Sequence, residues 1–392
     1  MYKRISLLLI LYGFTAMAQP YPVGRRALVF TDNSRGNRSI PAELYYPGSS
    51  AGNDVPVAAG TTRFPVVAFG HGFLMPVTAY RWLADSLVKY GFIVALPTSE
   101  SGFSPSHEQF GRDLAFLCER IPSLNDSASS FLFGRVRDKT AVAGHSMGGG
   151  SSFLATTYSS AITVLFNFAA AETTPSAQTA SLSVQRPALV FSGGSDCITA
   201  PSLQLQMYSN IPYSCKTYVS VNNALHCQFG NNESTCVLGQ ITSGCNNSSI
   251  TAADLFQKTV FMLLPFLQYY LQGDCSAGQI YQNNYNNITG VVKQRSCTAD
   301  PLGCVVTGTT NPPSSSGILL SATGGLAGIP VRIRSAPGLI SSVTLYDENG
   351  RLLVAVKGIA SNEYSIAVRE RGCFFLEVIA GRTRRTGKIV RW

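Results

Sequence analysis

The stretch Ala143–Gly149, AGHSMGG, decides the fold, because it places one serine between glycines where an apolar run opens into the sequence SSFLATTY. Gly144 and Gly148 permit a sharp turn that residues with a Cβ would obstruct. A G-x-S-x-G turn between a strand and a helix exposes the serine hydroxyl at the end of a sheet. The pattern predicts that Ser146 is a nucleophile, and the alternative is an ordinary glycine-rich turn.

Apolar runs on both sides of this stretch alternate with segments of helical spacing. Strands are expected at 64–70, 92–96, 141–144, 162–168, 188–191 and 217–221, and helices at 79–89, 107–120, 151–158 and 254–271. This alternation predicts an α/β fold with a mostly parallel sheet and helices on both faces. In such a fold, sites form at the carboxyl ends of the strands.

The two ends of the chain have a different character. Residues 1–18 combine a basic start, a short apolar run and the sequence Ala16-Met17-Ala18, which predicts a secretory signal peptide. The run is shorter than the roughly 20 residues of a membrane anchor. The α/β catalytic domain is expected at 19–277, an Asn-, Pro- and Ser-rich linker at 278–316, and a small all-β sandwich at 317–392.

Charge and cysteine content bound the function. The net charge of +9 is concentrated in residues 317–392, which hold eleven Lys or Arg against five Asp or Glu, so nucleic-acid binding is not indicated. Ten cysteines fit an exported, disulfide-bonded protein. Spacing leaves the connectivity open, and a zinc site is the alternative, although the chain has no C-x-x-C pair. Six cysteines lie close together in the sequence: Cys197, Cys215, Cys227, Cys236, Cys245 and Cys275.

A serine nucleophile needs a histidine base and a carboxylate that orients the base. In a strand–turn–helix arrangement these partners follow the serine in the order acid, histidine. Of the four histidines only His226 follows Ser146. Between Ser146 and His226 there are only two carboxylates, Glu172 and Asp196. Asp196 follows the strand at 188–191 and is the preferred acid, with Glu172 as the alternative.

The sequence Phe69–Phe73, FGHGF, ends an earlier strand in a glycine-rich loop. Backbone N–H groups in such a loop can stabilise a developing oxyanion. We assign the donors to Phe73 and to Met147, which follows the nucleophile. Both residues are also expected to contact the substrate. His71 and His145 are expected to structure the two loops rather than to transfer protons.

Four motifs in this order carry a family resemblance: GHGF at 70–73, GHSMGGG at 144–150, GGSDCITAP at 193–201 and LHC at 225–227. Over residues 21–273 the chain resembles secreted α/β-hydrolases related to dienelactone hydrolases, nearest to bacterial cutinases and poly(ethylene terephthalate) hydrolases. The resemblance implies Ser146 as nucleophile, Asp196 as acid, His226 as base, and Phe73 and Met147 as oxyanion donors. It also implies a disulfide near the acid and histidine loops, where Cys197 and Cys227 lie.

The resemblance bears on substrate choice. In the polyester hydrolases an aromatic residue of the first oxyanion loop and a tryptophan after the strand that follows the serine clamp an aromatic acid. Phe73 supplies the first residue, but the later loop, Ala169–Thr173, contains no aromatic residue. Trp82 and Trp392 lie too far along the chain to replace it easily. We therefore expect good activity on short esters and weak activity on poly(ethylene terephthalate).

The tail resembles a second family. VTLYDENGRLL at 343–353 and ERGCFFLEVIAGRTRRTGKIVR at 370–391 are similar to the C-terminal sorting domain of the type IX secretion system of Bacteroidetes. This resemblance implies export across the outer membrane by that machinery. A carbohydrate-binding or adhesive sandwich is the alternative. Cys373 falls where this family often has an aromatic residue and is expected to be a buried free thiol.

These observations together predict a secreted, monomeric serine carboxylic-ester hydrolase that acts on a small or polymeric ester through an acyl-enzyme. No metal or organic cofactor is required for this chemistry. Two alternatives remain: an amidase or peptidase with the same three residues, and a non-catalytic surface-binding protein built on a hydrolase fold.

Overall fold

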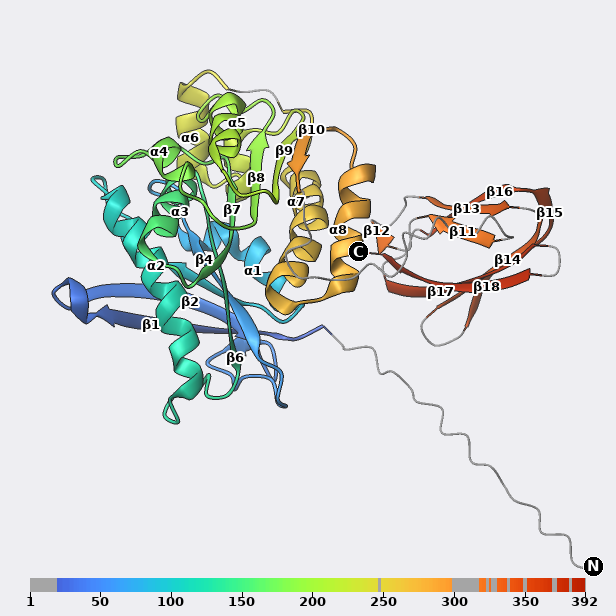
Figure 1. Cartoon of the computed structure of the whole chain (residues 1–392), viewed down its shortest axis with the longest axis horizontal. Coiled ribbons are helices and arrows are strands. Elements are labelled where there is room, and N and C mark those ends of the chain that lie inside the picture. Colours follow the sequence, from blue (N-terminus) through green and yellow to red (C-terminus); the bar gives the residue numbers. More distant parts are fainter. Residues whose placement is uncertain are drawn as a thin grey trace, which may run out of the picture. The chain divides into compact units, whose positions relative to one another are not determined.

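The computed structural model describes residues 20–245, 248–297, 317–321, 324–325, 330–336, 339–347, 351–368, 372–380 and 383–391. The chain divides into two compact units, Met1–Ala299 and Asp300–Trp392 (Figure 1). The predicted signal peptide and the sequence from 298 to 316 lie outside the described residues.

The first unit is built on a 10-stranded mixed sheet in the order β10-β9-β8-β7-β6-β4-β5-β2-β1-β3. The run from β5 through β4, β6, β7 and β8 to β9 is parallel. The predicted fold class, a mostly parallel sheet with helices, is therefore confirmed. The strands are β1 (Val23–Asp32), β2 (Arg38–Pro47), β3 (Gly52–Asn53), β4 (Phe64–Gly70), β5 (Ile93–Pro97), β6 (Val136–His145), β7 (Ile162–Phe168), β8 (Ala188–Gly193), β9 (Lys216–Val221) and β10 (Val291–Ser296).

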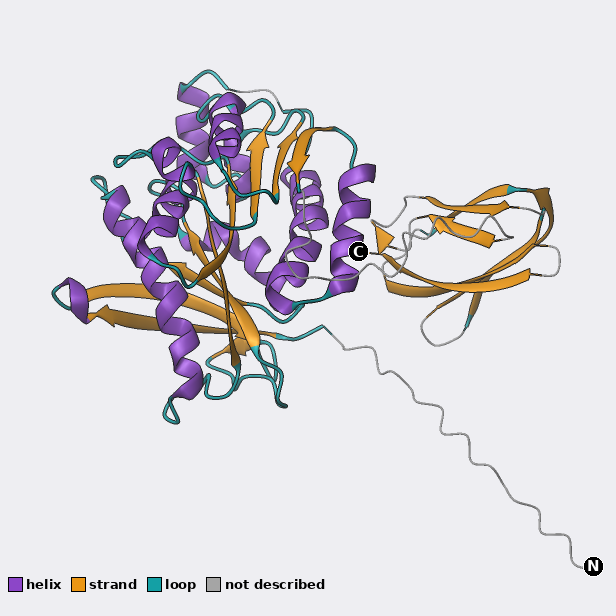
Figure 2. Ribbon diagram, viewed as in Figure 1, coloured by secondary structure: helices purple, strands orange, loops and turns teal. Residues whose placement is uncertain are grey.

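Helices cover both faces of this sheet (Figure 2). On one face α2, α3, α4 and α5 contact one another in sequence, and on the other α7 contacts both α1 and α8. The helices are α1 (Arg81–Val88), α2 (His107–Ser123), α3 (Met147–Tyr158), α4 (Ala177–Ser181), α5 (Pro201–Asn210), α6 (Ser234–Thr242), α7 (Ala252–Leu267) and α8 (Cys275–Asn287). Short helical turns are η1 (Asn33–Arg35), η2 (Val77–Tyr80), η3 (Leu124–Asp126), η4 (His226–Gly230) and the π-helical η5 (Gln268–Gln272).

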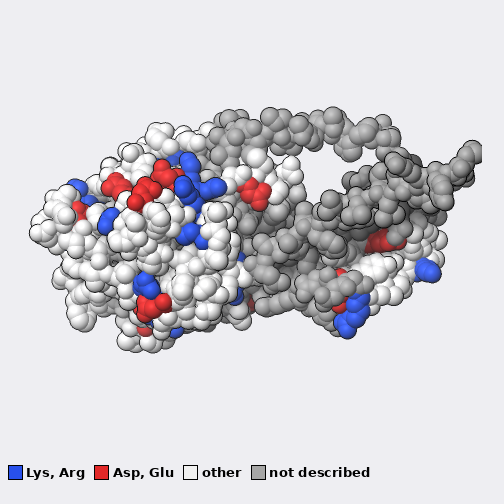
Figure 3. Space-filling model, turned by 90° about the horizontal axis from the view of Figure 1, so that it is seen from below, with Lys and Arg blue, Asp and Glu red and all other residues white. Residues whose placement is uncertain are grey.

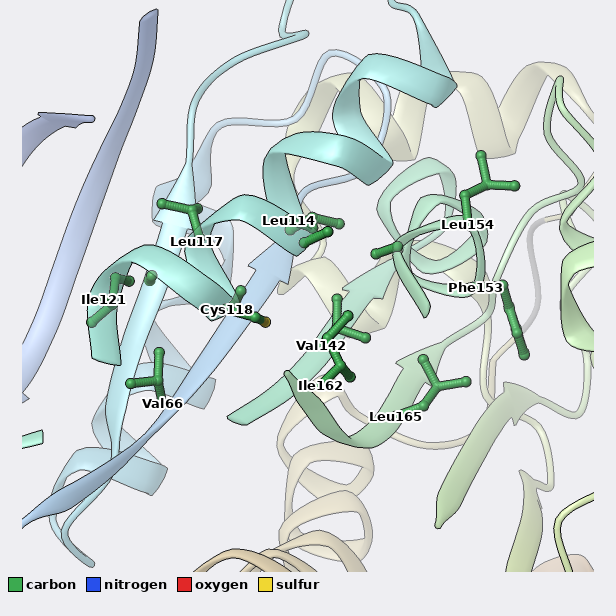
Figure 4. Packing of buried hydrophobic residues seen from close by; sticks show 14 of the residues in the cluster. Val66, Leu114, Leu117, Cys118, Ile121, Val142, Phe153, Leu154, Ile162 and Leu165 are labelled. Atoms are coloured by element: carbon green, nitrogen blue, oxygen red, sulfur yellow. The ribbon is translucent and has the colours of Figure 1, made fainter. Parts of the chain in front are cut away.

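The central strands are buried on both faces, which explains their continuous apolar sequences. Every residue of β4 is buried, and alternate residues such as Val66 and Ala68 join the core beneath α2 and α3. Figure 4 shows Leu114, Leu117 and other side chains of α2 packed over these strands. Burial of each large aliphatic side chain stabilises the fold by about 1.5–3 kcal/mol.

Two edges of the sheet differ from the sequence prediction. The hairpin of β1 and β2 extends the sheet on one side, and β10 pairs antiparallel with β9 on the other. The strand at 217–221 is therefore not the last one. Helix α8 and β10 occupy 275–296, where the sequence predicts the start of a linker at 278. The Asp274 side chain accepts hydrogen bonds from Ser276 N and Ala277 N at the start of α8, so this Asn-rich segment begins as a capped helix.

The second unit consists of two sheets, with the orders β11-β13-β16 and β12-β18-β17-β14-β15. Residues of both sheets, among them Ile333, Ile366, Val343 and Leu376, form one buried cluster, as in a β-sandwich. The strands are β11 (Gly317–Ser321), β12 (Gly324–Gly325), β13 (Pro330–Ala336), β14 (Ile340–Asp347), β15 (Leu352–Ser361), β16 (Glu363–Ala367), β17 (Gly372–Ala380) and β18 (Thr383–Arg391). The Cys373 side chain lies outside the described part of this unit.

The surface in Figure 3 carries acidic and basic side chains interspersed over a largely uncharged background. No helix within the described ranges has the length and apolar character needed to cross a bilayer. The loops that leave the carboxyl ends of β4, β6, β8 and β9 carry the candidate site residues, as expected for parallel strands.

Candidate active site

Ser146 occupies a strained turn between β6 and α3. Its backbone angles are φ 55° and ψ −119°, a conformation that residues with a Cβ rarely adopt. The backbone is closely packed around this turn. A Cβ at Gly144 would overlap the backbone of Gly148, and a Cβ at Gly148 would overlap the backbone of Gly70. Ser146 is partly exposed, whereas His145 and Met147 on either side are buried.

The strained turn is held by backbone hydrogen bonds to the loop after β7. Ser146 N–H donates to Phe168 O at 3.1 Å, and the Ser146 carbonyl accepts from Ala171 N at 2.9 Å. Gly150 N also donates to the Ser146 carbonyl at 3.0 Å. These contacts offset the cost of the turn and fix the position of the serine.

His226 and Asp196 form a buried pair. His226 Nδ1 lies 2.7 Å from Asp196 Oδ2, and the two residues are 2% and 4% exposed. An ionised carboxylate only accepts hydrogen bonds, so Nδ1 carries the proton and Nε2 is left as the basic nitrogen. His226 begins η4 after β9, and Asp196 follows β8, so adjacent parallel strands deliver the two side chains.

The Asp196 carboxylate has a full set of partners. Its Oδ1 accepts from the N–H groups of Ile198 and Thr199, both at 2.9 Å. Its Oδ2 lies 3.1 Å from the Thr199 hydroxyl in addition to His226 Nδ1. Hydrogen bonds of this kind fix the orientation of the carboxylate.

Glu172, the alternative acid, lies elsewhere. Its side chain is exposed, and its carboxylate accepts a hydrogen bond from Gln178 N at 3.1 Å, at the start of α4. The structure therefore brings Asp196, and not Glu172, to His226.

The two candidate oxyanion donors lie on loops that are joined to each other. Gly148 N–H in α3 donates to His71 O at 3.1 Å, which ties the turn of Ser146 to the loop after β4. Met147 begins α3, where the first N–H groups of a helix have no partner within the helix. The Phe73 side chain is 46% exposed, whereas Met147 is 3% exposed. Phe73 can thus present its ring to a substrate, and Met147 mainly its N–H.

His71 and His145 are both buried beside this site. The ring nitrogens of His71 lie 2.8 Å from Gly72 O and 3.0 Å from Ser99 O, so the ring links two loops. The ring of His145 lies 4.6 Å from that of His226, measured between centroids. Burial, and secondly the neighbouring His226, lowers the pKa of His145 well below 6.5, so this ring stays neutral.

Tyr80 and Thr199 contact the site and were not identified from the sequence. The Tyr80 hydroxyl accepts from Gly72 N–H at 2.9 Å and lies 2.9 Å from His145 Nδ1. Burial raises the pKa of Tyr80, so its hydroxyl keeps the proton that it can donate. Nothing in the sequence around Tyr80 signals this contact. The signal for Thr199 is its place three residues after Asp196, where a hydroxyl can fold back onto the carboxylate.

Disulfides start at the residues directly after the acid and the histidine. Cys197 pairs with Cys245, and Cys227 pairs with Cys236, which lies in α6. The family resemblance implies one disulfide near these loops, and the structure has two there. Neither of them joins Cys197 to Cys227. A third joins Cys215 to Cys297. Within the described residues, no group of three or more His, Cys, Asp or Glu side chains is placed to hold a metal ion.

The parallel sheet, the strained serine turn and the His–Asp pair at the strand ends define an α/β-hydrolase. A family model described as PET hydrolase-like matches residues 34–243, more than half of the chain. The chain therefore belongs to the PET hydrolase-like family, whose members are serine ester hydrolases. No curated protein matches the chain significantly.

Proposed function

We propose that this chain is an exported serine carboxylic-ester hydrolase in which Ser146 is the nucleophile, His226 the base and Asp196 the acid. The observation that carries the proposal is the 2.7 Å contact between His226 Nδ1 and Asp196 Oδ2, with the His226 ring 4.6 Å from the ring of His145, the residue before Ser146. Membership of a family of ester hydrolases supports the reaction class.

The reaction divides into two acyl transfers. Ser146 Oγ attacks the carbonyl carbon of the ester while His226 Nε2 takes the hydroxyl proton. Asp196 keeps the imidazole in the right tautomer and stabilises the imidazolium. The imidazolium then protonates the departing alcohol, which leaves an acyl group on Ser146. Water, deprotonated by His226, attacks this acyl-enzyme and releases the acid, and the proton returns to Ser146.

The N–H groups of Phe73 and Met147 stabilise the oxyanion of each tetrahedral intermediate. Met147 lies at the N-terminus of α3, where the helix dipole favours negative charge. The hydrogen bond from Gly148 N to His71 O supports this assignment, because it keeps the two donor loops at a constant separation. Preorganised donors of this kind each contribute about 100- to 1000-fold to kcat.

An amidase or peptidase would use the same three residues, and a binding protein would use none. A fluorophosphonate probe and a pair of substrates, p-nitrophenyl butyrate and its anilide, separate these cases. We expect labelling at Ser146 and far faster hydrolysis of the ester. Ser146→Ala and His226→Ala should each lower ester kcat about a thousandfold or more.

Ser152→Ala is the matched control, because Ser152 lies in the same helix and its hydroxyl donates to Gly149 O at 2.6 Å. It should be labelled and active like the wild type. Comparable rates on ester and anilide would make the chain an amidase. Failure of the probe to label the wild type would favour a binding protein.

The rest of the chain serves export in this proposal. Residues 1–18 form the signal peptide, and the sandwich at 317–392 engages the type IX secretion machinery. The catalytic domain begins at residue 19 and extends past 277 to the end of β10, since β10 pairs with β9 of the same sheet. The disulfides Cys197–Cys245, Cys215–Cys297 and Cys227–Cys236, seen among the described residues, support an oxidising destination. One chain carries all three catalytic residues, so a monomer is sufficient.

A further inference from the structure

Thr199 makes an unusual set of contacts for a side chain outside the catalytic three. Its Oγ1 lies 3.1 Å from Asp196 Oδ2, 3.1 Å from His226 Nδ1 and 3.1 Å from Ala169 O. The residue is 6% exposed, so water does not compete freely for these partners. One hydroxyl thus contacts the acid, the base and a third loop.

The valence of the hydroxyl limits how these contacts are used. The group has one hydrogen, which it can donate to Asp196 Oδ2 or to Ala169 O, and lone pairs that can accept from a donor. The His226 Nδ1–H donates chiefly to Asp196 Oδ2, at 2.7 Å, and the Thr199 oxygen is its second acceptor. The Nδ1–H of the imidazole therefore has two acceptors within hydrogen-bond distance.

The third loop is the one that holds the nucleophile. Ala169 has a φ of 44° and lies between Phe168, whose carbonyl accepts from Ser146 N, and Ala171, whose N–H donates to the Ser146 carbonyl. A hydrogen bond from Thr199 to Ala169 O ties the acid loop to this segment. Thr199 therefore connects the loops after β7, β8 and β9, which together carry or hold all three catalytic residues.

The backbone of Thr199 is fixed independently of its hydroxyl. Thr199 N–H donates to Asp196 Oδ1 at 2.9 Å, a contact that any residue except proline would keep. Valine has nearly the shape of threonine, so replacing threonine with valine removes the hydroxyl while leaving the acid loop in place. The hydroxyl can thus be tested without dismantling the loop.

We propose that Thr199 is a positioning residue for the ester hydrolase reaction: its hydroxyl holds the imidazole of His226 at the angle from which Nε2 reaches Ser146. The inference rests on the proposed function. Because Thr199 contacts Nδ1 and not Nε2, the nitrogen that faces the reacting groups in the proposed mechanism, its loss should slow the chemical step and leave substrate binding unchanged.

The test compares Thr199→Val, Thr199→Ala and Thr199→Ser with the wild type on p-nitrophenyl butyrate, measuring kcat and KM separately. We expect the Val and Ala variants to lose about 10- to 100-fold in kcat, the range for a hydrogen bond to a charged group, with KM within about twofold. Thr199→Ser should recover activity to within about threefold of wild type. The rate of fluorophosphonate labelling of Ser146 should fall in parallel with kcat.

Thr140→Val is the matched control. Thr140 is buried, its hydroxyl donates to Ala161 O at 2.8 Å, and it lies midway along β6, six residues before Ser146. This control should keep wild-type kcat and should show whether loss of a buried threonine hydroxyl affects folding alone. The Ala variant guards against misfolding of the Val variant, since it introduces no bulk.

Wild-type kcat in the Val and Ala variants, or a loss that Thr199→Ser fails to recover, would overturn the inference while leaving the proposed function intact. A change confined to KM would overturn it as well. An inactive, unlabelled wild-type protein would instead remove the proposed function itself.

Discussion

Asp196 and Glu172 are both carboxylates between Ser146 and His226 in the sequence, yet their surroundings differ. Asp196 is buried against His226, whereas Glu172 is exposed at the start of α4. Asp196→Asn should lower kcat about 10⁴-fold, because an amide can donate a hydrogen bond to Nδ1 and so favour the wrong tautomer of His226. Glu172→Gln should stay within about threefold of wild type. Steady-state kinetics on p-nitrophenyl butyrate decide between them, and a larger loss from Glu172→Gln would reverse the choice of acid.

At Ala171 the chain lacks an aromatic side chain that could stack on the aromatic acid of a polyester substrate. Its N–H donates to the Ser146 carbonyl, so a side chain at this position starts beside the nucleophile. Trp82 does not replace it, because its ring stacks on Phe256 at 4.0 Å between centroids and its Nε1 donates to Phe229 O at 3.0 Å. Wild-type protein should therefore hydrolyse short esters well and poly(ethylene terephthalate) film weakly.

Ala171→Trp tests this reading. The variant should raise hydrolysis of bis(hydroxyethyl) terephthalate by up to about tenfold, the upper range for one aromatic contact. Ala27→Trp, at an exposed position on β1, is the control and should leave the rate of bis(hydroxyethyl) terephthalate hydrolysis unchanged. Efficient film hydrolysis by the wild type would show that another surface makes the clamp.

At the scale of single residues, counting left only Asp196 and Glu172 as acids for His226, because the chain has one histidine after Ser146 and two carboxylates between them. Their catalytic roles stay predictions. Thr199 and Tyr80 could not be found in this way, because their contacts exist only once loops from different strands meet. Thr199 contacts a carbonyl 30 residues away, and Tyr80 contacts a histidine 65 residues away.

Among the elements, the central strands were predictable and the edge strands were not. Strands β4 and β7 are buried on both faces and give continuous apolar runs. Strand β10, VVKQRS, alternates between partly buried and exposed residues at the edge of the sheet, so its sequence resembles that of a polar loop. The sequence did not predict helix α6 for a related reason. Only Gln240 of its residues is buried, so the helix has no buried apolar face that would show in the sequence.

Helix α6 and the loops around it depend on disulfides, which gives a prediction about stability. Removing the Cys197–Cys245 bridge, which spans 48 residues, as Cys197→Ala/Cys245→Ala should lower the unfolding free energy by about 4 kcal/mol. Removing Cys227–Cys236, which spans 9 residues, should cost about 2.6 kcal/mol by the same loop-closure argument. Chemical denaturation of the two double variants measures both losses. A larger loss from the shorter loop would show that local contacts, such as Cys227 N–H to Gln240 Oε1, outweigh chain entropy.

For the whole catalytic unit, two buried histidines predict how stability depends on pH. Burial lowers the pKa of both His71 and His145 below the ordinary value of 6.5. Below that pH the unfolded chain binds protons that the folded chain does not, so the unfolding free energy falls as the pH drops from 7 towards 5. The limiting slope is about 1.4 kcal/mol per pH unit for each histidine. Denaturation curves at several pH values measure it, and His71→Gln should make the slope shallower. A free energy independent of pH would contradict the lowered pKa of these two histidines.

The division of the chain into two units predicts that catalysis and export can be separated. All three proposed catalytic residues lie in the unit Met1–Ala299, and the resemblance to a sorting domain lies in Asp300–Trp392. Deleting 317–392 should leave kcat and KM on p-nitrophenyl butyrate within about twofold of wild type, because no catalytic residue or core strand of the first unit is lost. In a host with type IX secretion, the truncated protein should stay in the periplasm while the full chain reaches the medium or the cell surface. Ser146→Ala in the full chain is the complementary control, since it should be exported normally and remain inactive. A truncated protein that is still exported would remove the sorting role, and one that folds but has lost most of its ester activity would show that the second unit contributes to the site.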